Sequence, residues 1–236
     1  MTQPSGDPPA KPASTSAAVA KLILSSLVGA ALVAAILFLL AWQFFWQGWL
    51  SIAALFIPMT ALNAYLLVTS PDLIERRKLK GRKLTGKQQI YMTWVYVAEI
   101  ALFVVPALDH RFGWSTMPAW LSIVGAVFLV AANVVWLIAK HENPYAGSAV
   151  TLYEGHRLIS TGPYALIRHP NYVGDLCMIL GLALGLGSWW GLAIFALLIP
   201  AIVIMIVDEE QFLRQNLPGY AAYRQQTRYR LIPHVW

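Results

Sequence analysis

Residues 22–71 read LILSSLVGAALVAAILFLLAWQFFWQGWLSIAALFIPMTALNAYLLVTSP and hold no charged side chain. A helix rises about 1.5 Å per residue and needs about 20 apolar residues to cross a bilayer, so this run predicts two membrane-spanning helices. The turn between them is expected at 43–49, where glutamines and interface-favouring tryptophans surround a glycine. The stretch therefore indicates a polytopic membrane protein of the all-α class.

The composition of the 236-residue chain excludes an ordinary soluble domain. Hydrophobic residues make up 58% of it and charged residues only 12%, whereas soluble domains carry about 25% charged residues. Disorder of the whole chain is excluded as well, because disordered chains are poor in apolar residues. The single cysteine, Cys177, excludes a disulfide framework and a cysteine-based zinc site.

Three further apolar stretches follow the first two. Residues 90–108 form one, interrupted only by Glu99, and residues 118–139 form another. The third, 172–207, is too long for one ordinary span and slightly short for two. Its centre reads Gly187-Ser188-Trp189-Trp190-Gly191, which predicts a tight turn and hence a helical hairpin, giving about six spans. The alternative is one long tilted helix and five spans.

The positions of the basic residues favour six spans. All Lys and Arg residues except Arg111 lie before the first span, in the loop 72–89, or in the segments 140–171 and 208–236. The positive-inside rule then places both termini in the cytoplasm and requires an even number of spans. The basic residues of 76–87 are expected to set this orientation and to touch anionic lipid, not nucleic acid.

The chain is thereby divided into three parts. Residues 1–17 are rich in Pro, Ser, Thr and Ala and are expected to form a disordered tail. Residues 18–139 hold the first four transmembrane helices and the basic cytoplasmic loop 72–89. Residues 140–236 hold the hairpin 172–207 between two polar, aromatic cytoplasmic segments, which are the place where chemistry is expected.

Two groups of motifs stand in those segments. Residues 154–174 read EGHRLISTGPYALIRHPNYVG, with many imidazole, guanidinium and phenol groups close together. After the hairpin come Asp208-Glu209-Glu210, then Tyr220-Ala221-Ala222-Tyr223, then Arg228-Tyr229-Arg230-Leu231-Ile232-Pro233. Together these motifs resemble the isoprenylcysteine carboxyl methyltransferase family, whose relatives include the integral-membrane phospholipid N-methyltransferases. The resemblance covers about 143–233.

The resemblance implies that 140–236 is a catalytic region that binds S-adenosylmethionine at the mouth of a tunnel open to the bilayer. Carried over position by position, the cofactor contacts fall on His156, Arg157, Leu158, Ile159, Tyr164, His169, Pro170, Asn171, Tyr172 and Glu209. A carboxylate such as Glu209 can accept both ribose hydroxyls. The tyrosine faces of this set suit a sulfonium cation.

Arg168 and Glu210 are the expected catalytic residues. Arg168, like Arg157, can hold the methionine carboxylate or an acidic acceptor through two parallel hydrogen bonds. A carboxylate or thiolate acceptor needs no general base, whereas an amine must lose a proton, for which His169 or Glu210 would serve. Metal-ligand spacing is missing around His141 and His156, so no metal is expected.

One turn of the family pattern differs in this chain. Prenylcysteine enzymes carry an arginine one turn before the Glu-Glu pair, where this chain reads Ile204-Met205-Ile206. The apolar spans around the donor site still predict a lipid-like or prenylated small acceptor that arrives from the bilayer, together with contact to membrane lipids.

Two other functions remain open on the sequence alone. A membrane reductase of the sterol reductase type, which uses NADPH, has a similar C-terminal half. A transporter or structural membrane protein is the third class, and it should place polar groups at mid-bilayer in several helices, where this chain has Glu99. Glu99 itself is expected either to line the substrate tunnel or to pair with an arginine of another helix.

Overall fold

The computed structural model describes residues 15–70, 86–145 and 157–236. Within these ranges all regular secondary structure is helical, which confirms the predicted all-α class. In chain order the elements are α1 (Thr15–Ala41), α2 (Trp46–Thr69), α4 (Gly86–Phe112), α5 (Ala119–Glu142), the short 3-10 helix η1 (Gly162–Ala165), α6 (Pro170–Gly185), α7 (Trp189–Asn216) and α8 (Tyr220–Gln226).

Five of these helices, α1, α2, α4, α5 and α7, are long and apolar enough to cross a membrane. The predicted C-terminal hairpin is confirmed, since α6 and α7 are separate helices joined at Leu186–Ser188. The alternative of one long tilted helix is wrong, because Gly187 adopts φ 71° and ends the helical path there. With 16 residues, or about 24 Å, α6 is shorter than a full span.

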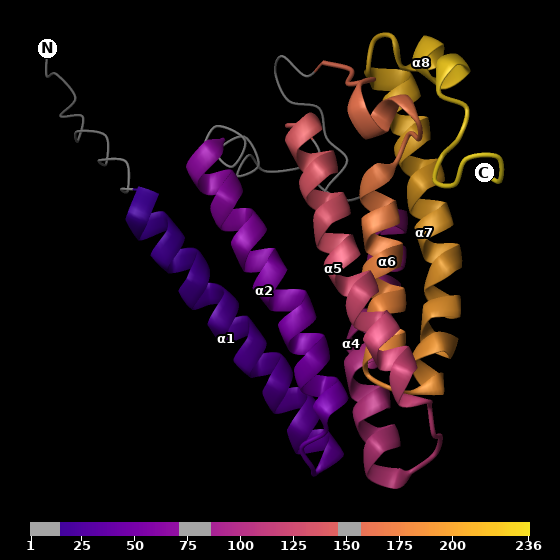
Figure 1. Ribbon diagram of the computed structural model, residues 1–236. Coiled ribbons are helices and arrows are strands. Elements are labelled where there is room, and N and C mark those ends of the chain that lie inside the picture. The colour runs from indigo at the N-terminus through magenta and orange to yellow at the C-terminus, as the bar shows by residue number, and fades with distance from the viewer. Residues whose placement is uncertain (1–14, 71–85, 146–156) are drawn as a thin grey trace, which may run out of the picture.

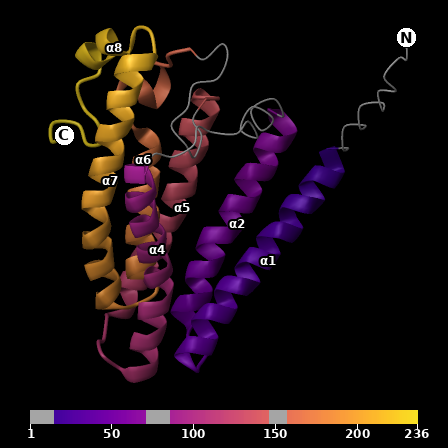
Figure 2. The same ribbon diagram turned by 180° about the vertical axis from the view of Figure 1, so that it is seen from behind.

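The helices run side by side as a bundle (Figure 1). The turn between α1 and α2 falls at 42–45, which overlaps the first part of the predicted region 43–49, and α2 begins at Trp46 within that region. The α1–α2 pair leans away from α6 and α7 towards the end of the bundle that carries α8, as both views show (Figures 1 and 2). That end also holds the first residues of α1 and α6 and the last residues of α5 and α7.

A glycine seam joins α5 to α6. A Cβ atom added to Gly125 would meet the backbone of Gly185, and one added to Gly181 would come within 2.9 Å of the Leu129 backbone nitrogen. The two helix backbones are therefore in close approach, as the spacing of Gly181 and Gly185 predicts. This seam fixes the position of the short helix α6 against α5, which is long enough to cross the membrane.

At the opposite end of the bundle a buried carboxylate ties three segments together. Asp109, near the end of α4, is 2% exposed. It accepts hydrogen bonds from the Ser115 backbone N–H at 2.7 Å, from the Ser115 hydroxyl at 2.5 Å and from the Ser188 hydroxyl at 2.5 Å. These bonds attach the α6–α7 turn to α4 and to the loop that follows it.

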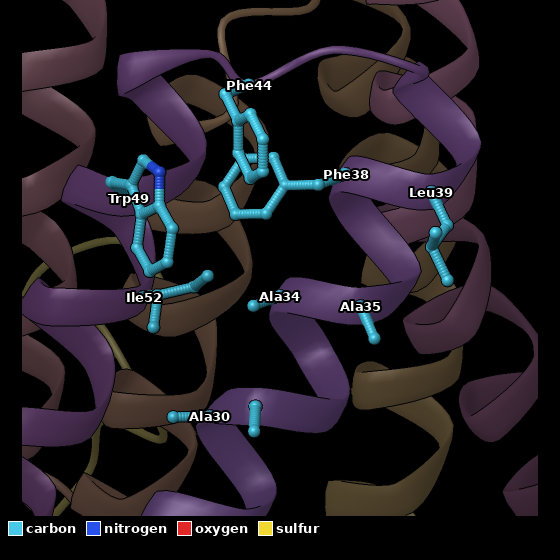
Figure 3. Close-up of a pocket in the computed structure, with 9 residues that line it drawn as sticks. Ala30, Ala34, Ala35, Phe38, Leu39, Phe44, Trp49 and Ile52 are labelled. Atoms are coloured by element: carbon cyan, nitrogen blue, oxygen red, sulfur yellow. The ribbon is translucent and has the colours of Figure 1, made fainter.

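An apolar groove of about 550 Å³ lies between α1 and the start of α2 (Figure 3). Phe38, Phe44, Trp49 and Ile52 line it together with alanines of α1. Its lining residues belong to the second half of α1, the turn after it and the start of α2. This end of the two helices lies away from α8 (Figure 1). It is therefore separate from the motif-bearing segments.

Two predicted segments fall largely outside the described residues. The tail 1–17 is described only from residue 15, where α1 begins. The basic loop 72–89 is described only from residue 86, the start of α4.

Candidate functional site

Glu210, near the end of α7, is the centre of a buried ion cluster. It is 3% exposed. Its Oε1 accepts a hydrogen bond from Arg168 Nε at 2.6 Å and lies 3.3 Å from His169 Nε2. Its Oε2 lies 3.1 Å from Arg230 Nη2 and 3.7 Å from Arg224 Nε. Both carboxylate oxygens are thus occupied by cations that come from three separate segments.

Arg168 is fixed by hydrogen bonds to Glu210 and to the C-terminal segment. Besides Glu210, its Nη1 donates to the backbone carbonyls of Thr227 at 2.8 Å and Arg228 at 2.7 Å. The backbone N–H groups of Arg168 and His169 donate to the carbonyls of Tyr229 and Arg230. The motif at the start of α6 is thereby anchored to the end of the chain.

Glu209 and Asp208 have partners on other faces of α7, because adjacent helical residues point about 100° apart. Tyr172 of α6 donates its hydroxyl to Glu209 Oε2 at 3.0 Å. Asp208 Oδ2 accepts from Tyr91 at 2.9 Å and from Gln88 at 2.6 Å, both on α4. Glu209 therefore lies between the arginine-rich cluster of Glu210 and a set of neutral donors.

The 3-10 helix η1 is fixed beneath α8 by tyrosine and threonine hydroxyls. Tyr223 donates to the Tyr164 carbonyl at 2.7 Å, and Thr227 reaches the same carbonyl at 3.4 Å. Burial raises the pKa of Tyr223 to about 12, so this phenol keeps its proton and acts as a donor. Tyr164 is itself buried, and its hydroxyl lies 3.4 Å from Asn171 Nδ2.

Asn171 carries a polar atom that the fold does not use. Its Oδ1 is buried and has no hydrogen-bond partner among the described residues. The backbone carbonyl of the same residue accepts from Trp136 Nε1 at 3.2 Å. A buried carbonyl oxygen without a donor is uncommon in a folded protein.

The structure brings some of the predicted site residues together and leaves others apart. Tyr164, His169, Asn171, Tyr172 and Glu209 come together around the starts of η1 and α6 and the end of α7. Pro170 is buried as the first residue of α6, and Leu158 packs against the cluster of Leu217, Tyr220 and Tyr223. Ile159 is half-buried and Arg157 is exposed. His156 lies outside the described residues.

Sequence reasoning missed Asp175, and it missed Arg224 and Arg230 as partners of Glu210. Asp175, one turn after Asn171, accepts from Trp136 Nε1 at 2.9 Å and lies within electrostatic range of Glu99, Glu209 and Lys140. A charge in an apolar stretch is the signal that singled out Glu99, and it applies to Asp175 as well. Nothing local in the sequence indicates that Arg224 and Arg230 converge on Glu210.

Glu99 forms no ion pair with an arginine among the described residues, and it is half-buried within electrostatic range of Asp175. That Glu99 lines a substrate tunnel stays a prediction. Met205 is half-buried and packs against the main hydrophobic core. Within the described ranges no group of three or more His, Cys, Asp or Glu side chains is arranged to hold a metal ion.

Three curated proteins are similar to parts of this chain. Delta(14)-sterol reductase TM7SF2 of Mus musculus is 33% identical over 85 residues, which is 35% of this chain and 20% of that protein. Cobalt-zinc-cadmium resistance protein CzcN of Cupriavidus metallidurans is 39% identical over 79 residues, 31% of this chain and 35% of that protein. Nickel-cobalt-cadmium resistance protein NccN of Alcaligenes xylosoxydans xylosoxydans is 37% identical over 75 residues, 30% of this chain and 33% of that protein. The chain thus matches at most 35% of the length of these relatives.

A protein-family model covers most of the segments that build the site, without α4 and the C-terminal segment. Residues 120–218 match the family described as phospholipid methyltransferase. This range runs from the start of α5 to just beyond α7 and includes η1, α6 and the residues from Tyr164 to Glu210 described above. The family match applies to this segment of the chain, and the five apolar helices of spanning length support an integral membrane protein.

Proposed function

We propose that the protein is an integral-membrane methyltransferase that transfers a methyl group from S-adenosylmethionine to a hydrophobic or lipid-like acceptor. The observation that carries the proposal is that the segment matching the phospholipid methyltransferase family also gathers Tyr164, His169, Asn171, Tyr172 and Glu209 at one end of the bundle. Within this group the motifs resemble those of the isoprenylcysteine carboxyl methyltransferases.

The residues present fit such a donor. Asn171 Oδ1 is a buried acceptor with no protein donor among the described residues, so it is suited to an amine or amide hydrogen of a ligand. Tyr172 binds only Oε2 of Glu209, and the carboxylate is suited to a ribose diol. The faces of Tyr164 and Tyr172 suit the positive sulfonium end. When bound, S-adenosylmethionine supplies an electrophilic methyl group.

Arg168 and Glu210 serve in this proposal as positioning residues. Their guanidinium and carboxylate groups are already engaged with each other and with the C-terminal segment. This internal pairing favours a role in holding His169 and the start of α6 in place over direct contact with an acceptor. An aligned pair of reactants in a site that excludes water needs little further help, because alignment can contribute about 7–11 kcal/mol in the best cases.

The site is proposed to face the cytoplasm. The segments that flank it carry Arg157, Arg168, Arg224, Arg228 and Arg230, and the positive-inside rule assigns such segments to that side. The acceptor is proposed to reach the site from the bilayer, between apolar helices.

A membrane reductase that uses NADPH is the second candidate. The similarity to a Delta(14)-sterol reductase, 33% identity over 85 residues, is the observation that favours it. The similarity covers 20% of that enzyme, and the family model over 120–218 favours methyl transfer.

Ligand titration of the purified protein in lipid nanodiscs separates the two candidates. S-adenosylmethionine and NADPH are each titrated and followed by calorimetry, with Glu209→Gln as the site variant and Gln211→Ala, an exposed neighbour on α7, as its matched control. Saturable binding of S-adenosylmethionine that is weakened only in Glu209→Gln is the expected result. Binding of NADPH alone would favour the reductase, and binding of neither would contradict both.

A further inference from the structure

Tyr220 is a buried tyrosine whose hydroxyl is unpaired among the described residues. It is 3% exposed and begins α8, directly after Gly219, which adopts φ 83°. Its ring packs in a small core with Leu217, Tyr223 and Leu158. The hydroxyl oxygen has no hydrogen-bond partner among the described residues.

Tyr223 shows that α8 can satisfy a buried phenol. It lies one turn later, is 4% exposed and has its ring 5.8 Å from that of Tyr220. Its hydroxyl donates to the Tyr164 carbonyl at 2.7 Å. The two residues therefore share helix, burial and side chain, and they differ in whether the fold supplies an acceptor.

The unpaired hydroxyl lies beside the candidate site. It is within electrostatic range of both Glu209 and Glu210 and of Arg168. Burial, and then the two carboxylates, raises the pKa of Tyr220 above its ordinary value, so the phenol remains protonated and can donate a hydrogen bond. Glu210 has both oxygens occupied by cations.

A buried polar atom without a partner destabilises the fold, because it has lost its hydrogen bonds to water. A phenylalanine at this position would fill the same space without that loss. The hydroxyl is therefore explained by an acceptor that is present only when a ligand is bound. Asn171 Oδ1 and Arg224 Nε are also buried without a hydrogen-bond partner among the described residues, and Asn171 Oδ1 calls for a ligand in the same way.

We propose that Tyr220 contacts the methyl donor directly and that its hydroxyl donates a hydrogen bond to bound S-adenosylmethionine. The inference rests on the proposed function and adds a residue of α8 to the donor site. It gives α8 two distinct tyrosines, of which Tyr223 supports η1 and Tyr220 recognises the ligand.

The experiment compares Tyr220→Phe with Tyr223→Phe in the full-length protein. The ligand-free melting temperature and the dissociation constant for S-adenosylmethionine are both measured in the same nanodiscs. Tyr220→Phe is expected to keep or raise the ligand-free melting temperature and to weaken donor binding about fivefold to tenfold. Tyr223→Phe, which removes a hydrogen bond made inside the protein, is expected to lower the ligand-free melting temperature.

Three results would count against this assignment. Unchanged donor affinity in Tyr220→Phe would overturn the role of Tyr220 while leaving the proposed function intact. A ligand-free melting temperature that falls as far as in Tyr223→Phe would show that the hydroxyl serves the fold, and it would also overturn the inference. Absence of donor binding by the unmodified protein would overturn the proposed function and this inference with it.

Discussion

Glu210 brings together groups that are more than fifty residues apart in the chain. Arg168 precedes α6, whereas Arg224 and Arg230 follow α7, and all three place a guanidinium nitrogen within 4 Å of the same carboxylate. A buried charge is tolerated only when such partners surround it. The local sequence Asp208-Glu209-Glu210 indicates only an acidic helix end, so this role of Glu210 becomes visible in the fold and not before.

We predict that Glu210→Gln destabilises the protein strongly. The substitution removes the negative charge and leaves Arg168, whose side chain is 4% exposed, without its counter-ion. Removing one partner of a buried ion pair costs about 3–5 kcal/mol. Thermal unfolding in detergent measures the loss, and Gln211→Ala on the exposed face of α7 is the control. A change below about 1 kcal/mol would contradict a central role for the cluster.

The neighbouring carboxylate is predicted to behave in the opposite way. Glu209 accepts one hydrogen bond from a tyrosine, and an amide at this position can accept the same bond. Glu209→Gln is therefore expected to cost less than about 1 kcal/mol of stability but about 1.5–3 kcal/mol of donor binding, because a hydrogen bond to a charged group is lost. Calorimetric titration of the folded variant tests this. Equal donor affinity in variant and unmodified protein would remove Glu209 from the donor site.

At the scale of elements, the seam between α5 and α6 decides where the site stands. Because α6 is short, the position of its first residues, Pro170 to Tyr172, is set by the contact between α6 and α5 and not by α6 spanning the bilayer. Gly181 and Gly185 could be read from the sequence as a close-packing motif. Their partner Gly125 could not, since a lone glycine in an apolar helix has no spacing that indicates what it faces.

We predict that Gly125→Ala separates these two helices. The added methyl group would meet the backbone of Gly185 and the Gly181 carbonyl, and backbone atoms cannot rotate away as a side chain can. Overpacking of this kind costs about 1–3 kcal/mol and occasionally more. Gly86→Ala is the matched control, because nothing lies within 4 Å of a Cβ atom there. Both are followed by thermal unfolding, and equal melting temperatures would mean that α5 and α6 adjust freely.

The elements that could be predicted from sequence are those determined by long apolar runs and by the turn residues that separate these runs. The charge-free run 22–71 and the motif Gly187–Gly191 yielded the first hairpin and the last one, because burial in lipid and interfacial aromatics act locally along the chain. The links among η1, α8 and the C-terminal segment did not follow. They depend on single hydroxyl and carbonyl contacts, such as Tyr223 to Tyr164, between residues 59 apart.

At the scale of the whole molecule, the motif-bearing segments gather at one end of the bundle. Figure 1 shows α8, the start of α6 and the end of α7 at the same end as the first turn of α1. The apolar groove and the Asp109 cluster occupy the opposite end. One end of the bundle therefore carries the charged and aromatic side chains of the motifs. The helices beneath this end expose large apolar side chains such as Leu32, Ile57 and Val97 to the surroundings.

For the proposed methyltransferase, this arrangement predicts that the acceptor is an amphiphile. Each methylene group that partitions from water into lipid contributes about 0.8 kcal/mol, so a long-chain acceptor concentrates beside the helices whereas a short-chain one stays in solution. We expect kcat/KM for a long-chain acceptor to exceed that for its short-chain analogue with the same nucleophile by at least about tenfold. Equal values in nanodiscs would indicate that the acceptor enters from water.

The nature of the acceptor's head group is tested at Met205. This residue lies one turn before Glu209 on α7 and places a thioether where prenylcysteine enzymes carry an arginine. A free carboxylate there would lack its partner, and burying an unpaired charge is unfavourable. We therefore expect carboxylate-bearing prenylcysteine analogues to be weak substrates of the unmodified protein and better substrates of Met205→Arg. Met205→Leu, which keeps the apolar packing against the core, is the control and should show no such gain. Efficient methylation of a prenylcysteine by the unmodified protein would contradict this interpretation of the acceptor site, and it would leave the donor site proposed at Glu209 and Tyr220 unaffected.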